Sequence, residues 1–494
     1  MNPGWILPLV LLLPALFAGA GLLAPSQRAA LRFITFGTLA SAAAAVAAAA
    51  IALSRAGELT ALGAWLMVDA LSAYHLLVMA VVFALSGLYA RSYFAHDAES
   101  GELSLRTARR FTALWFASMA AMHLVLVSNN LGLMWVGIEA TTLVTAFLIC
   151  IHGTPTSLEA MWKYLLMCSV GVALAFMGTL LVAASTHGSG VEGASALLWT
   201  ELRDAAARLN PKLLKTGFLF LVVGYGTKAG LAPMHNWLPD AHSQAPAPVS
   251  AIFSGFLLNA ALYCVLRTLP LVEALPGNAG WGREILIAFG LISILVAAVF
   301  IIAQHDLKRL LAYSSVEHLG IVALGVGLGG LGNVAALFHI LNNSVSKSVG
   351  FFCAGSIGHL AGTHDMRRIN RVTALSRIWG VGLTGSLLAI IGAAPFALFL
   401  SEFLIVYTAI QQGHTVIAAA LLAGLALVFV GALRHLISIT WEPLEGPVEP
   451  HRGTLIEGAI VFVPLTALLV LGVWVPAPFW SLLERAARIL GGAS

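Results

Sequence analysis

The chain has 494 residues, of which 59% are hydrophobic and only 10% are charged. Soluble proteins contain about 25% charged residues, so this composition, with a mean hydropathy of +0.92, indicates a polytopic membrane protein. The polar intervals are at most roughly thirty residues long, which excludes a separate soluble domain. The net charge of +4 comes without a basic cluster, so nucleic acid is excluded as a partner.

About fourteen stretches are apolar enough to cross a bilayer, which takes roughly twenty helical residues. They centre near residues 14, 42, 78, 120, 140, 172, 222, 258, 294, 318, 348, 392, 426 and 466. The predicted fold class is therefore all-α, a multi-pass bundle of about fourteen transmembrane helices. The first stretch has no basic residues before it, so we expect it to be retained rather than cleaved as a signal peptide.

The first three spans contain few polar residues. Asp69 stands at the start of the third span, where it is expected to cap the helix. In the fifth span, NNLGLMWVGIEATTLVTAFLI, Glu139 lies about halfway along, and a carboxyl group at that depth costs several kcal/mol unless it is paired or hydrated. Lys163 lies near the start of the sixth span, SLEAMWKYLL. We expect Glu139 and Lys163 to be able to pair, either structurally or as part of a relay.

The seventh span is interrupted. After a stretch of surface-helix periodicity, ALLWTELRDAAARL, an apolar helix beginning near Thr216 reaches Lys228, and Gly230 and Pro233 then break it. A lysine beside a break in a spanning helix is expensive unless it faces the protein interior or a water path. Lys228 is therefore the pivot of the predicted site, and a merely structural charge is the alternative.

A polar passage follows the break. His235, Asp240 and His242 lie in it, and we expect a loop that leads into the eighth span, which begins near Pro248. Their spacing fits such a loop better than a metal site, and His242 is a candidate modulator of proton uptake. Asn259 lies in the middle of the eighth span.

The tenth span opens with HDLKRLLAYSSVEHLG, which contains Asp306, Glu317 and His318. Asp306 is either a solvated helix cap or a site of proton uptake. Glu317 and His318 are candidate modulators of proton transfer, or simply structural groups.

The eleventh span, NVAALFHILNNSVSKSVGFFCAG, carries His339, Asn343 and Lys347 at a spacing of four, which places them on one helical face. The twelfth, LLAIIGAAPFALFLSEFLI, breaks at residues 392–395 and then carries Glu402. An amphipathic tail, FWSLLERAARIL, follows the fourteenth span.

The two halves of the chain share this plan. Glu139, Lys163 and the break from residue 230 recur as Glu317, His339 and the break from residue 392, at offsets of 178, 176 and 162 residues. Five spans separate equivalent helices, so the repeats are expected to be inverted, and paired broken helices point to a midplane transport site. Chance similarity is the alternative. The predicted units are an N-terminal three-helix segment (1–109), a first repeat of spans 4–8 (110–270), a second repeat of spans 9–13 (283–440), and a last span with the tail (453–494).

Arginine and lysine placement gives an orientation. If the N-terminus lies outside, fourteen of these residues fall in inside loops and nine outside, so we expect both termini on the outer side. The cysteines (Cys150, Cys168, Cys264 and Cys353) are dispersed through apolar helices and lack iron–sulfur or zinc spacing. No cofactor or metal is expected.

Five phrases carry a resemblance to a known family: MWVGIEATTL, SLEAMWKYL, GYGTKAGLAPMHNWLPDAHSQAPAPVSA, DLKRLLAYSSVEHLG and FLSEFLI. The chain resembles the antiporter-like subunits of complex I and of the group 4 membrane-bound hydrogenases, most closely the hydrogenase-4 component F type. The phrases run from about residue 110 to residue 410, and the fourteen spans match over the whole chain.

The resemblance implies a proton relay. It implies that Glu139 modulates Lys228, with Lys163 as a charged partner, and that the relay continues through His339 and Lys347 to Glu402 as the terminal acid. At two relay positions, where the family has a lysine or histidine, this chain has the amides Asn259 and Asn343. An amide does not change protonation in the physiological range, so these steps would need water chains.

The function that follows is a proton-translocating subunit of a membrane-bound hydrogenase, formate-hydrogenlyase-like or complex I-like oxidoreductase, without an active site of its own. Its partners would be other membrane and hydrophilic subunits, the lipid bilayer, and protons or sodium, in the cytoplasmic membrane of a bacterium or archaeon. The alternatives are a subunit of a multisubunit cation/proton antiporter or inorganic-carbon uptake complex, and a membrane scaffold that no longer conducts.

Overall fold

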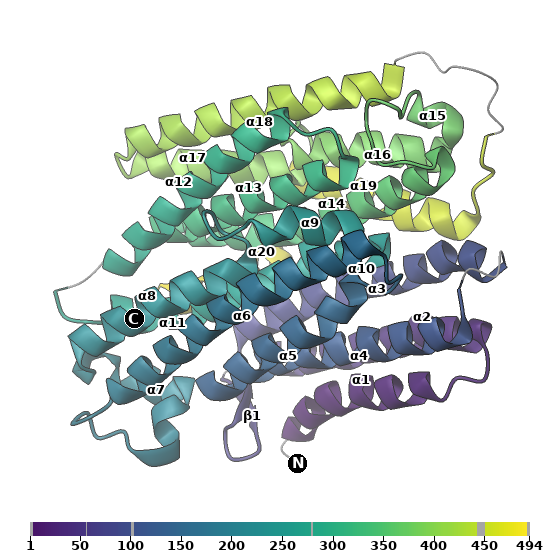
Figure 1. Cartoon of the computed structure of the whole chain (residues 1–494). Coiled ribbons are helices and arrows are strands. Elements are labelled where there is room, and N and C mark those ends of the chain that lie inside the picture. The colour runs from purple at the N-terminus through teal and green to yellow at the C-terminus, as the bar shows by residue number, and fades with distance from the viewer. Residues whose placement is uncertain (1–2, 56, 100–102, 278–279, 442–449, 492–494) are drawn as a thin grey trace.

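Long helices that run side by side form the whole bundle in the computed structural model (Figure 1). The structure describes residues 3–55, 57–99, 103–277, 280–441 and 450–491. Within these ranges, eleven helices are long and apolar enough to cross a membrane. Three more spans are the broken pairs α8/α9 and α16/α17 and the polar helix α14, so the all-α fold with about fourteen spans is confirmed.

The N-terminal segment contains η1 (Pro3–Trp5), α1 (Ile6–Leu22), α2 (Gln27–Leu53), β1 (Leu59–Ala61), β2 (Leu66–Val68) and α3 (Ala70–Glu99). Spans 4–8 contain α4 (Leu105–Val127), α5 (Leu131–Ile149), α6 (Pro155–Ala184), η2 (Gly193–Leu197), α7 (Trp199–Ala205), η3 (Ala206–Arg208), α8 (Pro211–Ala229), α9 (Trp237–Gln244), α10 (Ala247–Ile252), the π-helical turn η4 (Phe253–Leu257) and α11 (Leu258–Glu273). Spans 9–13 contain α12 (Trp281–Ile302), α13 (Leu307–Leu328), α14 (Leu331–Ala361), α15 (Val372–Leu375), α16 (Arg377–Ile390), α17 (Ala397–Gln411) and α18 (Thr415–Trp441). The chain ends with α19 (Leu455–Val473) and α20 (Ala477–Leu490).

Polar caps begin many of these helices. The side chains of Ser104, Asn130, Thr154 and Asn210 each accept a hydrogen bond from a backbone N–H in the first turn of α4, α5, α6 and α8. Such caps satisfy N–H groups that have no partner within the helix. Asp69 has the cap role predicted for it, because its Oδ1 accepts from the N–H of Ser72 at 2.9 Å.

The spans differ in how far they are buried inside the bundle. The apolar windows of α10–α11 and α13 are completely buried, whereas those of α1, α18 and α19 are only 28–33% buried. Figure 1 shows α1 at one edge of the bundle and α18 at the opposite edge. Ionisable residues on the central helices are thus kept from lipid by surrounding helices, which is where such residues are tolerated.

Both predicted helix breaks are confirmed. Gly230 ends α8 in the left-handed region at φ 81°, and Gly392 follows α16 at φ 68°. A cis peptide bond precedes Pro233 in the first break and Pro395 in the second. The passage after the first break differs from the expected loop, because it contains a short helix, α9, on which both Asp240 and His242 lie.

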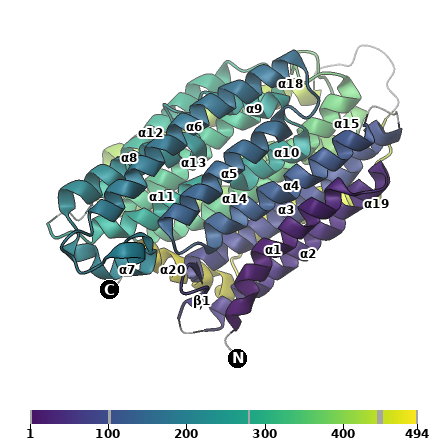
Figure 2. The same ribbon diagram turned by 60° about the horizontal axis from the view of Figure 1, so that its bottom comes forward.

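The β1–β2 hairpin, α7 and both marked ends of the chain gather at one end of the bundle (Figure 2). The hairpin is antiparallel and pairs Leu59 with Val68. Having both ends on one side is what an even number of spans requires. The expected unit limits at residues 109, 270 and 440 fall within α4, α11 and α18, the last residues of the tail (492–494) lie outside the described ranges, and the division into inverted units stays a prediction.

Candidate functional site

Lys228 is completely buried on the last turn of α8. Its Nζ donates hydrogen bonds to Thr142 Oγ1, at 3.0 Å, and to the Tyr164 hydroxyl. The same nitrogen lies 4.5 Å from the centre of the Tyr164 ring, within the range of a cation–π contact. The Tyr164 hydroxyl is also hydrogen-bonded to Thr145 Oγ1, at 2.5 Å. The ammonium group is therefore surrounded by neutral oxygen atoms.

Glu139 lies on α5 one helical turn before Thr142, the residue that accepts from Lys228. Its side chain is only half-buried, but its Oε2 is a buried atom without a hydrogen-bond partner. Within the described ranges, the salt bridges do not include one between Glu139 and Lys228. The carboxylate is thus one helical turn from the hydroxyl that accepts from Lys228, and the described residues show no salt bridge between the two; we call such a lysine and carboxylate an open pair.

The expected pairing of Glu139 with Lys163 is wrong. Lys163 has a side chain 49% exposed, and its Nζ pairs with Glu159 Oε1 at 2.7 Å and with Asp240 Oδ2 at 3.0 Å. Asp240 Oδ1 also pairs with Arg309 at 2.5 Å. Lys163 therefore belongs to a surface ion network between α6, α9 and α13, apart from the buried site of Lys228.

Asn259 lies where the two halves meet. Its Nδ2 donates to Ser344 Oγ on α14 and to the carbonyl oxygen of Gly255, both at 3.1 Å, while its buried Oδ1 has no partner. A second contact crosses between the halves nearby, from Ser254 Oγ to Ser315 Oγ at 2.7 Å. Polar groups thus continue from the first half into the second.

Lys347 is the buried lysine of the second half. Its Nζ donates to the carbonyl oxygen of Leu311 at 2.8 Å and to Ser314 Oγ. Glu317 lies one turn after Ser314 on α13, is 2% exposed, and has a buried Oε2 without a partner. The arrangement resembles that of Lys228: the lysine donates to neutral oxygens, and a carboxylate lies one helical turn from the hydroxyl that accepts from it.

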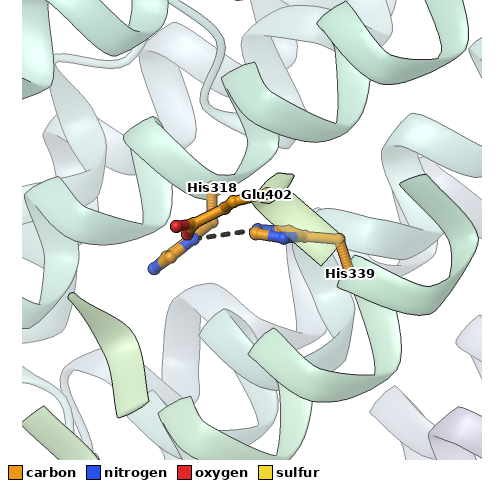
Figure 3. A group of neighbouring side chains, drawn as sticks. All are labelled: His318, His339 and Glu402. Carbon is orange, nitrogen blue, oxygen red and sulfur yellow. Dashed lines mark hydrogen bonds between the residues drawn. The ribbon is translucent and has the colours of Figure 1, made fainter. Parts of the chain in front are cut away.

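His318, His339 and Glu402 converge from α13, α14 and α17 (Figure 3). Nδ1 of His318 and Nε2 of His339 are 3.0 Å apart, and His339 Nδ1 lies 2.8 Å from Ser401 Oγ. One ligand atom from each of His318, His339 and Glu402 lies within 4.8 Å of the other two. These three side chains could exchange a proton or hold a metal ion.

The second helix break positions Glu402. A Cβ atom added at Gly392 would stand 2.2 Å from Glu402 Oε2, so the carboxylate packs directly against this glycine. The equivalent position in the first break, Gly230, instead faces Leu238, whose Cδ1 would be 2.5 Å from an added Cβ.

The remaining candidates are Asn343, His242 and Asp306, which lie on or beside three different helices. Asn343 is buried on the same face of α14 as His339 and Lys347, but neither its Oδ1 nor its Nδ2 has a partner. His242 is buried against Phe351, with ring centres 4.9 Å apart, and both its nitrogens are unpartnered. Asp306 caps α13 by accepting from the N–H of Arg309 at 2.9 Å, and burial raises the pKa of its carboxyl.

Sequence reasoning missed the neutral partners of the buried charges, namely Thr142, Tyr164, Ser314 and Ser401. One signal was present: Thr142 stands three residues after Glu139, and Ser314 three before Glu317, so each shares a helical face with a candidate acid. Serine and threonine are frequent in these helices, so the sequence alone does not identify which hydroxyls accept from the buried lysines.

The family model described as "NADH:quinone oxidoreductase/Mrp antiporter, TM" matches residues 128–427. The hydrogenase-4 component F homolog of Methylacidiphilum infernorum (isolate V4) is 38% identical over 415 residues, which cover 84% of this chain and 86% of that protein. A chain of the membrane-bound sulfane sulfur reductase, an archaeal respiratory membrane complex, superposes with a TM-score of 0.85 at 24% identity, over 99% of this chain and 98% of that one. A chain of respiratory complex I from Thermus thermophilus gives 0.81 at 22% identity, over 98% and 100%.

The fold, together with the buried polar residues Lys228, Asn259, Lys347 and Glu402, defines an antiporter-like, multi-pass membrane subunit. The chain belongs to the NADH:quinone oxidoreductase/Mrp antiporter transmembrane family, so the resemblance seen in the sequence is confirmed.

Proposed function

We propose that this chain translocates protons, as a subunit of a membrane-bound oxidoreductase of the hydrogenase, formate-hydrogenlyase or complex I type. One observation carries the proposal: each half buries a lysine that donates to neutral oxygens, and a carboxylate one helical turn from an accepting hydroxyl forms no ion pair with that lysine among the described residues. A closed pair would fix its charges, whereas an open one permits the lysine to gain and lose a proton as the carboxylate moves.

The relay runs from Glu139 and Lys228, past Asn259, to Lys347 and then to the His318, His339 and Glu402 group. Contacts between the halves at Asn259–Ser344 and Ser254–Ser315 support this route. The amides Asn259 and Asn343 have unpartnered polar atoms that suit water molecules as links. Lys163 is omitted from the route because its ion pairs hold it at the surface. Asp306 and His242, at the α9–α13 end, serve proton uptake.

The chain would bind other membrane and hydrophilic subunits, which carry out the redox chemistry. Similarity to a hydrogenase-4 component F homolog favours a hydrogenase-type complex. We place it in the cytoplasmic membrane of a bacterium or archaeon, with both termini outside, on the distribution of arginine and lysine.

The test is proton translocation by the complex that copurifies with the chain, reconstituted in vesicles and driven by its own electron donor. Lys228→Ala should abolish translocation while the complex remains assembled. Lys212→Ala is the matched control, because Lys212 lies on the same helix but is exposed. Unchanged pumping by an assembled Lys228→Ala complex would disprove the proposal, and repeating the assay with and without sodium identifies the transported ion.

A further inference from the structure

We propose that His318, His339 and Glu402 form a binding site for a divalent transition-metal ion of the zinc type, and that occupation of this site stops proton transfer. The metal is an inhibitor of the relay and not a resident cofactor. The binding site stands on the geometry alone, and only its inhibitory effect rests on the proposed function.

The ligand atoms are already close to the required arrangement. Zinc bonds to histidine nitrogen and carboxylate oxygen are about 2.0–2.2 Å long, so ligand atoms in a tetrahedral site lie roughly 3.3 Å apart. Nδ1 of His318 and Nε2 of His339 are 3.0 Å apart, and all three ligand atoms lie within 4.8 Å of one another. Small side-chain rotations would bring the carboxylate into place, and water or a hydroxyl would complete the fourth position.

The ligands are also available and oriented. Figure 3 shows the Glu402 carboxylate beside the ring nitrogen of His318, with His339 approaching from the other side. Glu402 is 6% exposed, and its carboxylate has no hydrogen-bond or ion-pair partner among the described residues. Ser401 Oγ holds Nδ1 of His339 at 2.8 Å and thereby turns Nε2 toward the cluster, as the outer partner of a metal-binding histidine does.

Two imidazoles and one carboxylate select among cations. Imidazole suits zinc, cobalt, nickel and copper, whereas magnesium and calcium prefer sites made of oxygen atoms. A bound ion would take the lone pairs of His339 and Glu402 that proton transfer needs. It would also tie α17, which follows the second helix break, to α13 and α14.

Binding is tested by titrating the purified full chain with Zn²⁺ by calorimetry, and with Co²⁺ by its visible absorption, which reports nitrogen and oxygen ligands. His339→Gln and Glu402→Gln should each weaken binding at least tenfold, and Ser401→Ala, which removes the orienting partner, about tenfold to hundredfold. His123→Gln is the control: His123 is equally buried, on α4, and neither of its nitrogens has a partner, so binding should not change. Equal affinity in all variants overturns the site.

Inhibition is measured separately. Zn²⁺ should stop proton translocation by the reconstituted complex, Mg²⁺ at the same concentration should not, and Ser401→Ala should raise the inhibitory Zn²⁺ concentration in parallel with its weaker binding. If Zn²⁺ binds as predicted but leaves pumping intact, the inhibitory role is wrong. If the complex pumps no protons at all, the proposed function fails while the metal site still stands on the titrations.

Discussion

Each half of the chain contains a helix broken at a glycine, but the two broken helices carry side chains of opposite type. In the first half, the broken helix carries a lysine, Lys228, and the glycine of the break packs against Leu238. In the second half, the broken helix carries an acid, Glu402, which packs on its glycine, and the lysine moves to the unbroken helix α14. A common architecture therefore fixes where a charge can be buried, while the side chains decide its sign.

The same comparison extends to the partners of the lysines. In the first half the accepting hydroxyl, Thr142, comes three residues after the carboxylate of Glu139; in the second, Ser314 comes three residues before Glu317. Repeats that are inverted in the membrane keep the order of equivalent residues along the chain, so Thr142 and Ser314 are not equivalent positions even though each accepts from a buried lysine. The two acids differ in access: Glu139 is half-buried and Glu317 is 2% exposed. The side chain of Glu139 is thus the more accessible of the two, although its Oε2 atom is buried.

The largest effect is expected at a closed ion pair, the one between Arg267 on α11 and Asp69 at the start of α3. Arg267 donates from Nη1 and Nη2 to Asp69 at 2.5 and 2.6 Å, and its side chain is 1% exposed. Arg267→Met would strand the buried carboxylate and should lower the free energy of unfolding by about 3–5 kcal/mol. Thermal unfolding of the purified chain measures this. A change of less than about 1 kcal/mol, the range of an exposed pair, would contradict the distinction between closed and open charges.

Replacing Lys228 or Lys347, which donate to neutral oxygens, should not lower stability. Lys228→Met and Lys347→Met remove an ammonium group without stranding a salt-bridged carboxylate, so the unfolding temperature should stay the same or rise. Proton translocation should fall about a hundredfold or more in each, because a positioned proton-transfer group contributes roughly that factor. Equal losses show that both halves lie on one route. A loss at Lys228 alone would show that the second half does not conduct protons and has a structural role.

The sequence predicted the spans, both helix breaks and the burial of Lys228, Lys347 and Glu402, because hydrophobic length, Gly/Pro interruptions and the cost of charge in lipid are local properties. It did not predict the partners. Lys163 pairs with Asp240, 77 residues away, because of how α6 and α9 face each other, and that rotation is set by packing. The convergence of His318, His339 and Glu402 depends in the same way on the positions of three separate helices.

The third prediction tests the glycines of the two breaks. Gly392→Ala and Gly230→Ala each place an alanine at positive φ, which costs about 1–2 kcal/mol, so both should lower stability to a similar degree. Only Gly392→Ala displaces a residue of the proposed relay, because its Cβ would stand 2.2 Å from Glu402 Oε2. Translocation should then fall roughly tenfold to hundredfold, as for a misplaced reacting group. The Gly230 variant, which displaces Leu238, should lose less, and equal losses would show that backbone strain alone is responsible.

The smallest effect is expected at Asn259, between the halves. Asn259→Leu removes the hydrogen bond to Ser344 and the unpartnered Oδ1, and so removes the polar lining on which water would bridge the two lysines. The loss should be about two- to tenfold in translocation rate, corresponding to a net hydrogen bond of roughly 0.5–1.5 kcal/mol. Asn259→His restores a polar and titratable group at this position and should keep the rate within about twofold of the parent. If Asn259→Leu pumps normally, protons do not pass this residue, and the two halves conduct separately.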